Sequence, residues 1–269
     1  VVVTADNGMP FPRVKGQVYE YSNHLPLAIS WPDGIQNPGR VVDDFVSFID
    51  FAPTFLELAG VDPRESGMQE MEGRSLTEIF YSEKDGQVIE ERDFVLVGKE
   101  RHDLGRPNDQ GYPVRGIVKE EWLYLHNYHP DRWPAGNPET GYLNCDGGAT
   151  KSYILNQRRV FGNPEFWELN FGLRVSEELY NIKEDPYCLN NLAANLTYSA
   201  KLEALKREMT EKLTTQADPR ILGKGEVFMS YPYALSNRGM YEKIMAGQEV
   251  NTGWVYDSDF EPEWVGEHD

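Results

Sequence analysis

The sequence has few cysteines and no long apolar run, and each shortage excludes a class of protein. Its two cysteines, Cys145 and Cys188, lie far apart and lack the spacing of metal ligands, which excludes a disulfide-rich scaffold and a thiolate metal site. Two buried free thiols are the simpler expectation, and a disulfide between them in an oxidising compartment is the alternative. The apolar stretches are short and interrupted, so the sequence predicts no membrane-spanning helix and no membrane partner.

Cations are also scarce, with 26 lysines and arginines against 44 aspartates and glutamates and a net charge of −18. A chain with this balance repels phosphate backbones and anionic lipids, which argues against a nucleic-acid partner. An anionic small molecule would instead need a local cationic pocket. The 269 residues, 40% of them hydrophobic, are sufficient for one large domain or for a core with a smaller subdomain.

Residues 1–5 form an apolar, β-branched run that has no capping or turn residue before it and ends at Asp6-Asn7-Gly8. We predict a buried parallel strand here, because the ligand-binding loops of α/β sheets follow the carboxyl ends of such strands. Natural domains rarely begin inside a strand, so we expect an N-terminal half of the protein that this chain lacks. Residues 25–31 are a second apolar strand candidate.

Two helices are predicted in the next stretch. Asp50 can cap a helix that runs through Pro53, a residue tolerated in a first turn, to Ala59, with Gly60 as its C-terminal stop. A shorter helix is expected near residues 75–81. Both helices belong to an α/β core portion, which we expect to occupy residues 1–90.

The pattern then changes to that of a small antiparallel subdomain over residues 91–217. Strands are predicted at 93–97, 114–119, 122–128 and 178–182, the middle two joined by a turn at Glu120-Glu121. Residues 129–176, rich in aromatics, glycine and proline, are hard to assign and suit a long surface or pocket-forming loop. Helix 199–217 has the apolar period of an amphipathic helix and should pack on the small sheet. Residues 218–269 are predicted as an acidic, aromatic tail that wraps the body.

Asp6 and Asn7 place a carboxylate beside an amide, and both offer the hard oxygen ligands that Ca²⁺ prefers. Gly8 then allows the chain to turn sharply. From these three residues alone an ordinary Asx turn is the better interpretation, since the tripeptide is common in loops. The sequence after Gly8 decides between a calcium site and an ordinary Asx turn.

Three ordered blocks resemble the type I sulfatases of the alkaline phosphatase superfamily. They are Asp6-Asn7-Gly8 with KGQVY at 15–19 and PLAI at 26–29, the helix DFAPTFLELAG at 50–60, and ELYNIKEDP at 178–186 with NNLA at 190–193. Within this family, Pro10-Phe11-Pro12, Glu100-Arg101-His102 and the YPVR at 112–115 are similar to the heparan N-sulfatase branch and its bacterial relatives. The resemblance extends from residue 1 to about residue 217.

The resemblance implies the C-terminal portion of an alkaline-phosphatase-like α/β core. It also implies a calcium-dependent hydrolase of sulfate esters or sulfamates, whose substrates are sulfated saccharides, in particular glycosaminoglycan-derived units. Asp6 and Asn7 would be two of the calcium ligands, and Lys15 would be a catalytic cation at the sulfuryl group or the leaving oxygen. An anionic leaving group needs such electrostatic stabilisation. The family works outside the cytosol, so an exported protein is expected.

Four further residues are candidates for substrate binding, namely His24, Glu100, Arg101 and His102. His24 matches a position that is cationic in many sulfatases, and a packed histidine before an apolar strand is an almost equal alternative. The other three begin a polar run that suits a sugar-recognising loop. An ordinary polar connection between strands is the alternative for that run.

One element of the sulfatases is absent from this sequence. Their formylglycine nucleophile is made from the first residue of a Cys/Ser-x-Pro-x-Arg motif, and the nearest match, at 30–34, has Gly34 in place of the arginine. The resemblance therefore implies that formylglycine and the other calcium ligands belong to the missing N-terminal half. The alternatives are a phosphate or phosphonate ester hydrolase of the same superfamily and a non-catalytic carbohydrate-binding relative.

Overall fold

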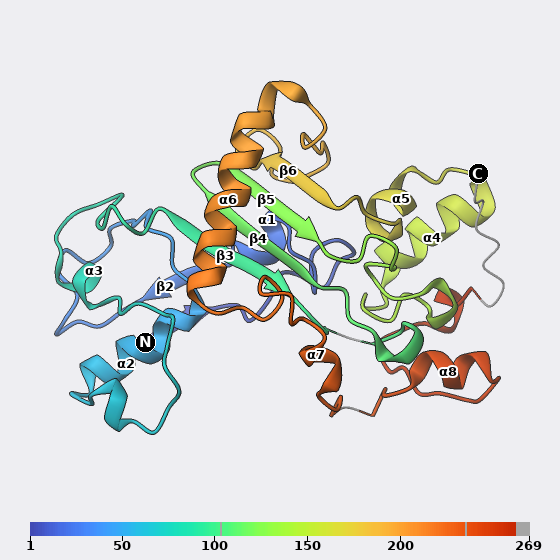
Figure 1. Ribbon diagram of the computed structural model, residues 1–269, viewed down its shortest axis with the longest axis horizontal. Coiled ribbons are helices and arrows are strands. Elements are labelled where there is room, and N and C mark those ends of the chain that lie inside the picture. The colour runs from blue at the N-terminus through green and yellow to red at the C-terminus, as the bar shows by residue number, and fades with distance from the viewer. Residues whose placement is uncertain (103, 235, 262–269) are drawn as a thin grey trace. The chain divides into compact units, whose positions relative to one another are not determined.

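The structure is a computed structural model that describes residues 1–102, 104–234 and 236–261 (Figure 1). The chain divides into two units. The first unit comprises residues 1–5, 26–96 and 118–120, and the second comprises residues 6–25, 97–117 and those from 121 onward. The fold class is the predicted one, a mixed α/β arrangement with a small antiparallel sheet and a packed C-terminal helix.

In the first unit, strands β1 (Val2–Thr4) and β2 (Leu27–Ile29) form a two-stranded antiparallel sheet. The prediction of a buried parallel strand over residues 1–5 is wrong, because Val1 and Val3 are 86% and 62% exposed. A two-stranded ribbon gives each strand a single neighbour, so the apolar side chains of β1 remain open to solvent.

Both predicted helices of the first unit are present, as α2 (Phe51–Leu58) and α3 (Thr77–Tyr81). Two short 3-10 helices, η1 (Phe48–Asp50) and η2 (Pro63–Glu65), flank α2. The core of the unit is built on three buried side chains at α3, namely Leu76, Ile79 and Phe80. Partly buried apolar side chains surround them: Ile29, Trp31, Ile35, Val42, Val46, Phe51, Val88 and Ile89.

Asp50 does not cap α2 in the predicted way. Its own backbone is helical, and its carboxylate accepts from the backbone N–H groups of Ser47 at 3.0 Å and Arg74 at 2.7 Å. The same carboxylate lies 2.9 Å from Arg92 Nη1, and the two side chains are almost completely buried. A buried guanidinium is costly without a carboxylate beside it. The Asp50 carboxylate therefore pairs with Arg92 and does not cap α2.

The four predicted strands form one sheet in the order β3 (Phe94–Lys99), β4 (Val114–Lys119), β5 (Trp122–Asn127) and β6 (Glu177–Asn181). Strands β5 and β6 are antiparallel, with Leu123 opposite Tyr180. The turn between β4 and β5 begins at Glu120, whose φ of 53° suits a two-residue hairpin connection. The predicted strands are therefore confirmed to within two residues at each end.

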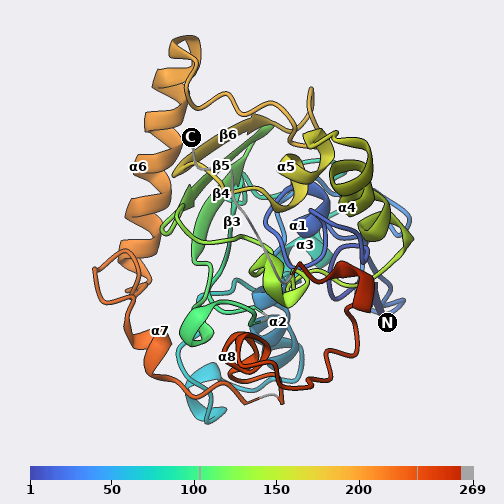
Figure 2. The same ribbon diagram turned by 90° about the vertical axis from the view of Figure 1, so that its right-hand side faces the viewer.

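Helix α6 (Ser199–Thr215) lies across one face of this sheet, as Figures 1 and 2 show. Its buried residues are the ones that the apolar period predicts, namely Leu202, Leu205, Met209 and Leu213. At its start, the ring of Tyr198 packs 5.4 Å from that of Trp122. The short helix α1 (Glu20–Asn23) lies on the opposite side of the sheet.

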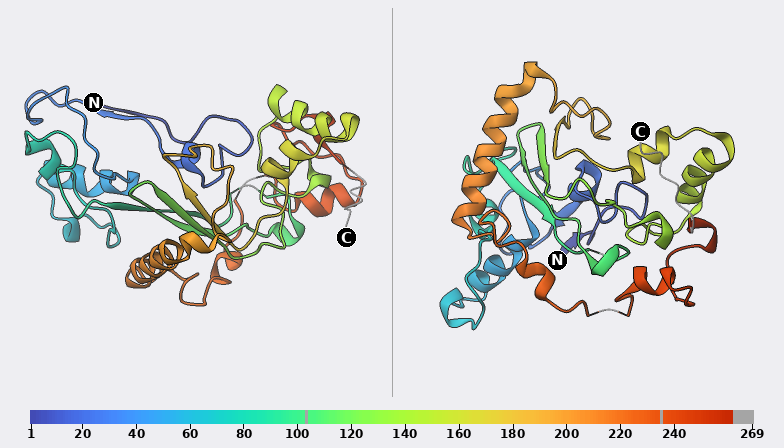
Figure 3. Two further views of the ribbon diagram at one scale, coloured as in Figure 1. Left: turned by 90° about the horizontal axis from the view of Figure 1, so that it is seen from above. Right: turned by 45° about the vertical axis from the view of Figure 1, so that its right-hand side comes forward.

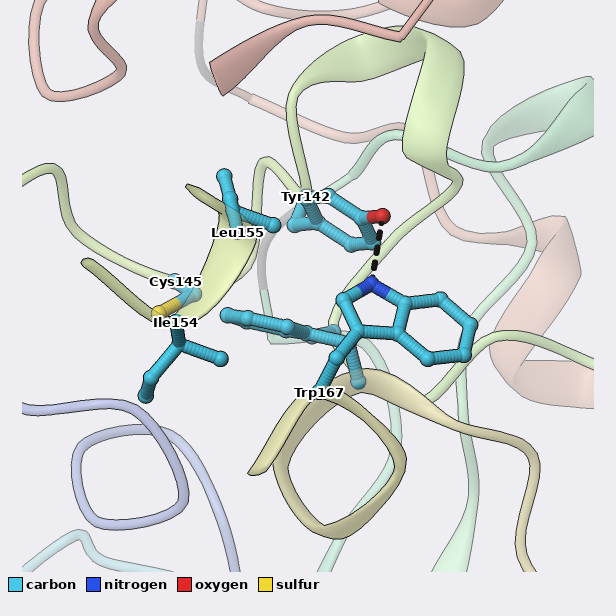
Figure 4. Close-up of a cluster of buried hydrophobic side chains, with 7 residues drawn as sticks. Tyr142, Cys145, Ile154, Leu155 and Trp167 are labelled. Atoms are coloured by element: carbon cyan, nitrogen blue, oxygen red, sulfur yellow. Dashed lines mark hydrogen bonds between the residues drawn. The ribbon is translucent and has the colours of Figure 1, made fainter. Parts of the chain in front are cut away.

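Residues 129–176 contain two helices, so the prediction of a long loop is wrong. Helices α4 (Ala149–Phe161) and α5 (Glu165–Phe171) pack against each other. Their buried side chains form a core cluster with the loop before α4 (Figure 4): Ala135, Tyr142, Cys145, Ile154, Leu155, Trp167 and Phe171. Helix α4 buries Lys151 with Ile154 and Leu155 and leaves the apolar Tyr153, Val160 and Phe161 exposed, so its sequence has no apolar period that predicts it.

The C-terminal part of the chain packs within the second unit. Helix α8 (Met240–Met245) contacts the 3-10 helices η3 (Pro107–Asp109) and η4 (Pro138–Thr140) (Figure 3). Buried side chains from distant segments meet here, namely Leu104, Leu143, Met240 and Val255. The remaining short elements are η5 (Leu196–Tyr198), α7 (Val227–Ser230) and η6 (Asp257–Asp259).

The two cysteines are free and buried, which confirms the simpler expectation. Burial raises the pKa of Cys145 and of Cys188 to about 11, so neither is a thiolate at neutral pH. Over residues 1–102, 104–234 and 236–261, none of the helices combines the length and the apolar character that crossing a bilayer requires.

The buried Asp50–Arg92 pair gives a prediction for stability. Asp50→Ala leaves the guanidinium buried without its carboxylate, so it should lower the free energy of unfolding by about 3–5 kcal/mol, measured by chemical denaturation. The control is Asp62→Ala, because the Asp62–Arg64 pair has the same chemistry while its arginine side chain is 89% exposed. The control should lower the unfolding midpoint only slightly, because it removes an exposed ion pair and the cap of the short helix η2. Equal midpoints for the two variants would contradict the prediction.

Candidate functional site

The segment 6–25, which carries the predicted metal and catalytic residues, is anchored by Glu178 of β6. The buried Glu178 carboxylate accepts hydrogen bonds from Tyr19 Oη at 3.1 Å, Tyr180 Oη at 2.5 Å and Asn127 Nδ2 at 2.7 Å. Burial raises the pKa of Tyr19 to about 12, so its phenol remains a donor. The lysine motif that ends at this tyrosine is therefore fixed on the sheet.

Arg13 is a second anchor on the other side of Lys15. Its Nη1 donates to the carbonyl oxygen of Leu169 at 2.8 Å, and its Nη2 donates to that of Cys188. The guanidinium also lies over the ring of Tyr19, 3.8 Å from the centroid. Lys15 thus stands between two fixed residues.

Lys99, at the end of β3, holds the turn that Lys15 begins. Its Nζ donates to the carbonyl oxygen of Gly16 at 2.8 Å and to Gln17 Oε1 at 3.1 Å. Burial lowers the pKa of Lys99 well below its ordinary value, and neighbouring arginines act in the same direction. Through these two hydrogen bonds, Lys99 fixes the backbone of the turn at Gly16 and the side-chain amide of Gln17.

His102 packs directly against Gly16. A Cβ atom at Gly16 would lie 2.8 Å from His102 Cε1, and the φ of this glycine is 72°. Only glycine combines this backbone conformation with such a close approach. Two of the predicted residues, Lys15 and His102, are therefore brought to the same turn, although they are 87 positions apart in the sequence.

Asp146 completes this arrangement, and sequence reasoning missed it. Its Oδ2 lies 2.7 Å from Lys15 Nζ, and the two side chains are 27% and 34% exposed. The sequence signal is weak, because Asp146 is followed by Gly147 and Gly148 and reads as an ordinary turn. Lys99 was missed for a similar reason, since a lysine at the end of a strand is most often a solvated one.

Asp6 and Asn7 follow β1 after one intervening residue, Ala5. Asp6 is exposed, and the half-buried Asn7 donates from Nδ2 to the carbonyl oxygen of Gly8 at 2.8 Å. Their side chains offer the oxygen donors that calcium prefers, but within the described part of the chain no three His, Cys, Asp or Glu residues gather around a possible ion. The donor types fit calcium, and their number is too small for a complete site.

His24 follows α1 and forms a local pair with Glu20, four residues earlier. Its Nδ1 lies 2.5 Å from Glu20 Oε1, and the imidazole is 78% exposed. The hydrogen bond to this carboxylate raises the pKa of His24 above its ordinary value. This exposed imidazole is within reach of an anionic ligand, and its role in substrate binding stays a prediction.

Glu100 and Arg101 have partners within the protein. The Glu100 carboxylate binds Arg115 Nη2 at 2.8 Å and Arg220 Nη2 at 2.6 Å. Arg101 Nη1 donates to the carbonyl oxygens of Phe228 at 3.1 Å and Tyr231 at 2.7 Å. These contacts fix the backbone that leads to His102, and the substrate-binding roles of Glu100 and Arg101 also stay predictions.

The arrangement is suited to holding an anion. Lys15 presents a partly exposed ammonium on a turn that Lys99 and His102 support, in a chain whose net charge is strongly negative. An ammonium is a compact point charge that suits sulfate or phosphate oxygens. Because the turn is fixed before a ligand arrives, little ordering is needed on binding.

Comparisons with known proteins find relatives among the sulfatases. The family model described as N-sulphoglucosamine sulphohydrolase, C-terminal, matches residues 14–97. An ulvan-active sulfatase of Formosa agariphila is 26% identical over 227 residues, which cover 82% of this chain and 34% of the relative. The human N-sulphoglucosamine sulphohydrolase is 25% identical over 227 residues, which cover 81% of this chain and 42% of the relative. The chain thus spans between a third and a half of the length of these relatives.

Among solved structures, a putative sulfatase from Bacteroides thetaiotaomicron has a similar fold. The TM-score is 0.50 and the identity 19%, with 88% of this chain and 39% of the other covered. At this identity the likeness concerns the fold alone, and it agrees with the α/β class. The family model, the curated relatives and the fold together identify the chain as a relative of the sulfatases that corresponds to their C-terminal region.

Proposed function

We propose that the chain is the C-terminal part of a calcium-dependent sulfatase that hydrolyses sulfate esters or sulfamates of glycosaminoglycan-type saccharides. The relatives named for ulvan and for N-sulphoglucosamine support a sulfated saccharide as the substrate. The formylglycine nucleophile comes from sequence outside this chain, since no Cys/Ser-x-Pro-x-Arg motif occurs in it. Export from the cytosol belongs to the same proposal and rests on the resemblance alone.

The observation that carries the proposal is the fixed turn at Lys15. In sulfate transfer, negative charge develops on the leaving oxygen, and a cation that is already in place lowers the barrier. The Lys15 ammonium contacts the sulfuryl oxygens or the leaving oxygen, while Lys99 and Gly16 keep the turn in one conformation. Such preorganisation is the main contribution of this chain to the reaction.

His102 binds the sugar rather than the reacting bond. Its exposed imidazole donates a hydrogen bond to a hydroxyl or a sulfate oxygen, and its packing on Gly16 keeps it beside the Lys15 turn. His24, Glu100 and Arg101 contribute further contacts to the saccharide. Each of these three side chains already has a hydrogen-bond or ion-pair partner within the protein. Its orientation is therefore set before the substrate binds.

Asp6 and Asn7 are two of the calcium ligands. Calcium takes roughly six to eight oxygen ligands, so the others come from the part of the protein that carries the nucleophile. When bound, the ion acts as a Lewis acid that stabilises charge on the sulfate oxygens. Carboxylate and amide oxygens at adjacent positions support this assignment.

The test of the function is sulfate release by the full-length protein from a sulfated glucosamine saccharide, with a phosphate monoester of the same sugar as the comparison. We expect sulfate release that EDTA stops and Ca²⁺ restores. Preferential cleavage of the phosphate ester would instead favour a phosphoesterase of the same superfamily. Binding of the saccharide without cleavage of either ester would favour a non-catalytic relative.

Asp6→Ala tests the calcium assignment. Loss of a carboxylate ligand should lower kcat on the saccharide at least about 100-fold, because the ion is bound weakly or wrongly. A readout besides activity is the calcium-induced rise in Tm, which this variant should lose.

The matched control for Asp6→Ala is Asp33→Ala, which removes another exposed aspartate from a loop. The control should keep both the wild-type turnover and the calcium-induced rise in Tm. If Asp6→Ala behaved like this control, the metal assignment would be wrong.

His102→Ala tests the saccharide contact. Loss of one hydrogen bond to the sugar should raise KM for the natural saccharide about 10-fold with little change in kcat. An aryl sulfate lacks the sugar, so its kinetic constants should stay within about twofold of the wild type.

The control for His102→Ala is His129→Ala, which removes a half-exposed imidazole from a different loop and should change neither substrate. Equal losses on saccharide and aryl sulfate in His102→Ala would place this residue in the chemical step or in the support of the turn. No loss on either substrate would return it to an ordinary connection between strands.

A further inference from the structure

Asp146 lies in contact with the proposed catalytic cation. Its Oδ2 is 2.7 Å from Lys15 Nζ, and the contact joins residues that are 131 positions apart. At 27% and 34% exposure, the two side chains stand at the edge of the protein rather than in bulk solvent. An ion pair between freely solvated side chains contributes little to stability, because two long side chains must be ordered at once. How well this pair can orient Lys15 therefore depends on how firmly Asp146 itself is held.

The loop that carries Asp146 is held by a buried lysine. Lys151 Nζ donates to the carbonyl oxygens of Gly141 and Cys145, both at 2.7 Å, and lies 3.3 Å from Asp259 Oδ2. Lys151 and Asp259 are completely buried. The residue before Asp146 is therefore bonded at its carbonyl to a side chain that has no room to move.

Core packing holds the same loop from the other side. The Cys145 side chain belongs to the cluster drawn in Figure 4, together with Tyr142, Ile154, Leu155 and Trp167. Further along, the backbone N–H of Gly147 donates to the carbonyl oxygen of Trp254. The backbone on both sides of Asp146 is thus fixed, so its carboxylate is a stationary acceptor for the ammonium.

We propose that Asp146 is the positioning residue of Lys15: its carboxylate sets the direction in which the ammonium meets the sulfuryl group. The inference rests on the proposed function, because it assigns a role relative to that reaction. Lysine has a flexible four-carbon stem, and a charged acceptor on a fixed backbone removes much of its rotamer freedom. Lys99 fixes the backbone of the turn, and Asp146 fixes the end of the side chain.

A double-mutant cycle tests this role in the full-length protein. Asp146→Asn should lower kcat about 10- to 100-fold on saccharide and aryl sulfate alike, with KM and Tm nearly unchanged, because a misplaced catalytic group affects every substrate. In a Lys15→Met background the same change should cost less than about twofold, since there is no ammonium left to position. Asp131→Asn, at a loop aspartate that is 78% exposed, is the matched control and should change nothing.

Losses that multiply in the double variant would overturn the proposal, because Asp146 would then act independently of Lys15. A fall in Tm that accounts for the lost activity would overturn it as well. Wild-type kcat in Asp146→Asn, with Lys15→Met inactive, would show that the pair is not needed, while the proposed function would stand.

A second measurement does not depend on sulfatase activity. Pulse labelling of lysines with acetic anhydride, read by mass spectrometry, should modify Lys15 several-fold faster in Asp146→Asn than in the wild type, with the exposed Lys224 as the internal reference. Unchanged labelling of Lys15 would overturn the positioning role. Faster labelling in a protein that releases no sulfate from any substrate would instead contradict the proposed function alone.

Discussion

One buried carboxylate, that of Glu178, determines where the candidate site lies. It accepts from the hydroxyl groups of Tyr19 and Tyr180 and from the amide of Asn127, so its charge is compensated by three donors. A buried carboxylate that loses a donor is strongly penalised, and this makes the contact with Tyr19 hard to break. Everything placed relative to Tyr19, including the turn at Lys15, depends on this contact.

The fold could be predicted where burial follows a period. Helix α6 buries the apolar positions that its sequence repeats every three to four residues, and the strands of the main sheet alternate with clear turn residues. Helix α4 could not be predicted, because one of its buried residues is a lysine, Lys151, which donates hydrogen bonds to backbone carbonyl oxygens. The burial of β1 was predicted wrongly, because an apolar run specifies that burial is favourable but not which surface covers it.

The candidate site was predictable only in part. Lys15 and His102 could be chosen from the resemblance, but nothing in their spacing indicates that both belong to one turn. That proximity depends on Gly16, whose missing side chain lets the imidazole approach. The contact between Lys15 and Asp146 was beyond prediction, because it arises from two loops that are each fixed by unrelated packing.

The sequence blocks that resemble the sulfatases have different physical roles. In the block at 50–60, Asp50 forms an ion pair with a buried arginine. In the block at 178–186, Glu178 accepts hydrogen bonds from the hydroxyl groups of two tyrosines. These residues are buried and bonded within the protein, so matching them identifies the fold and not the reaction. The block at 15–19 combines a structural residue, Tyr19, with a partly exposed cation, Lys15, on a turn that Lys99 also holds. The proposed chemistry of this chain therefore depends on a few residues around one turn. Variants that change the charge at this turn without changing its geometry are the ones that discriminate between the candidate functions.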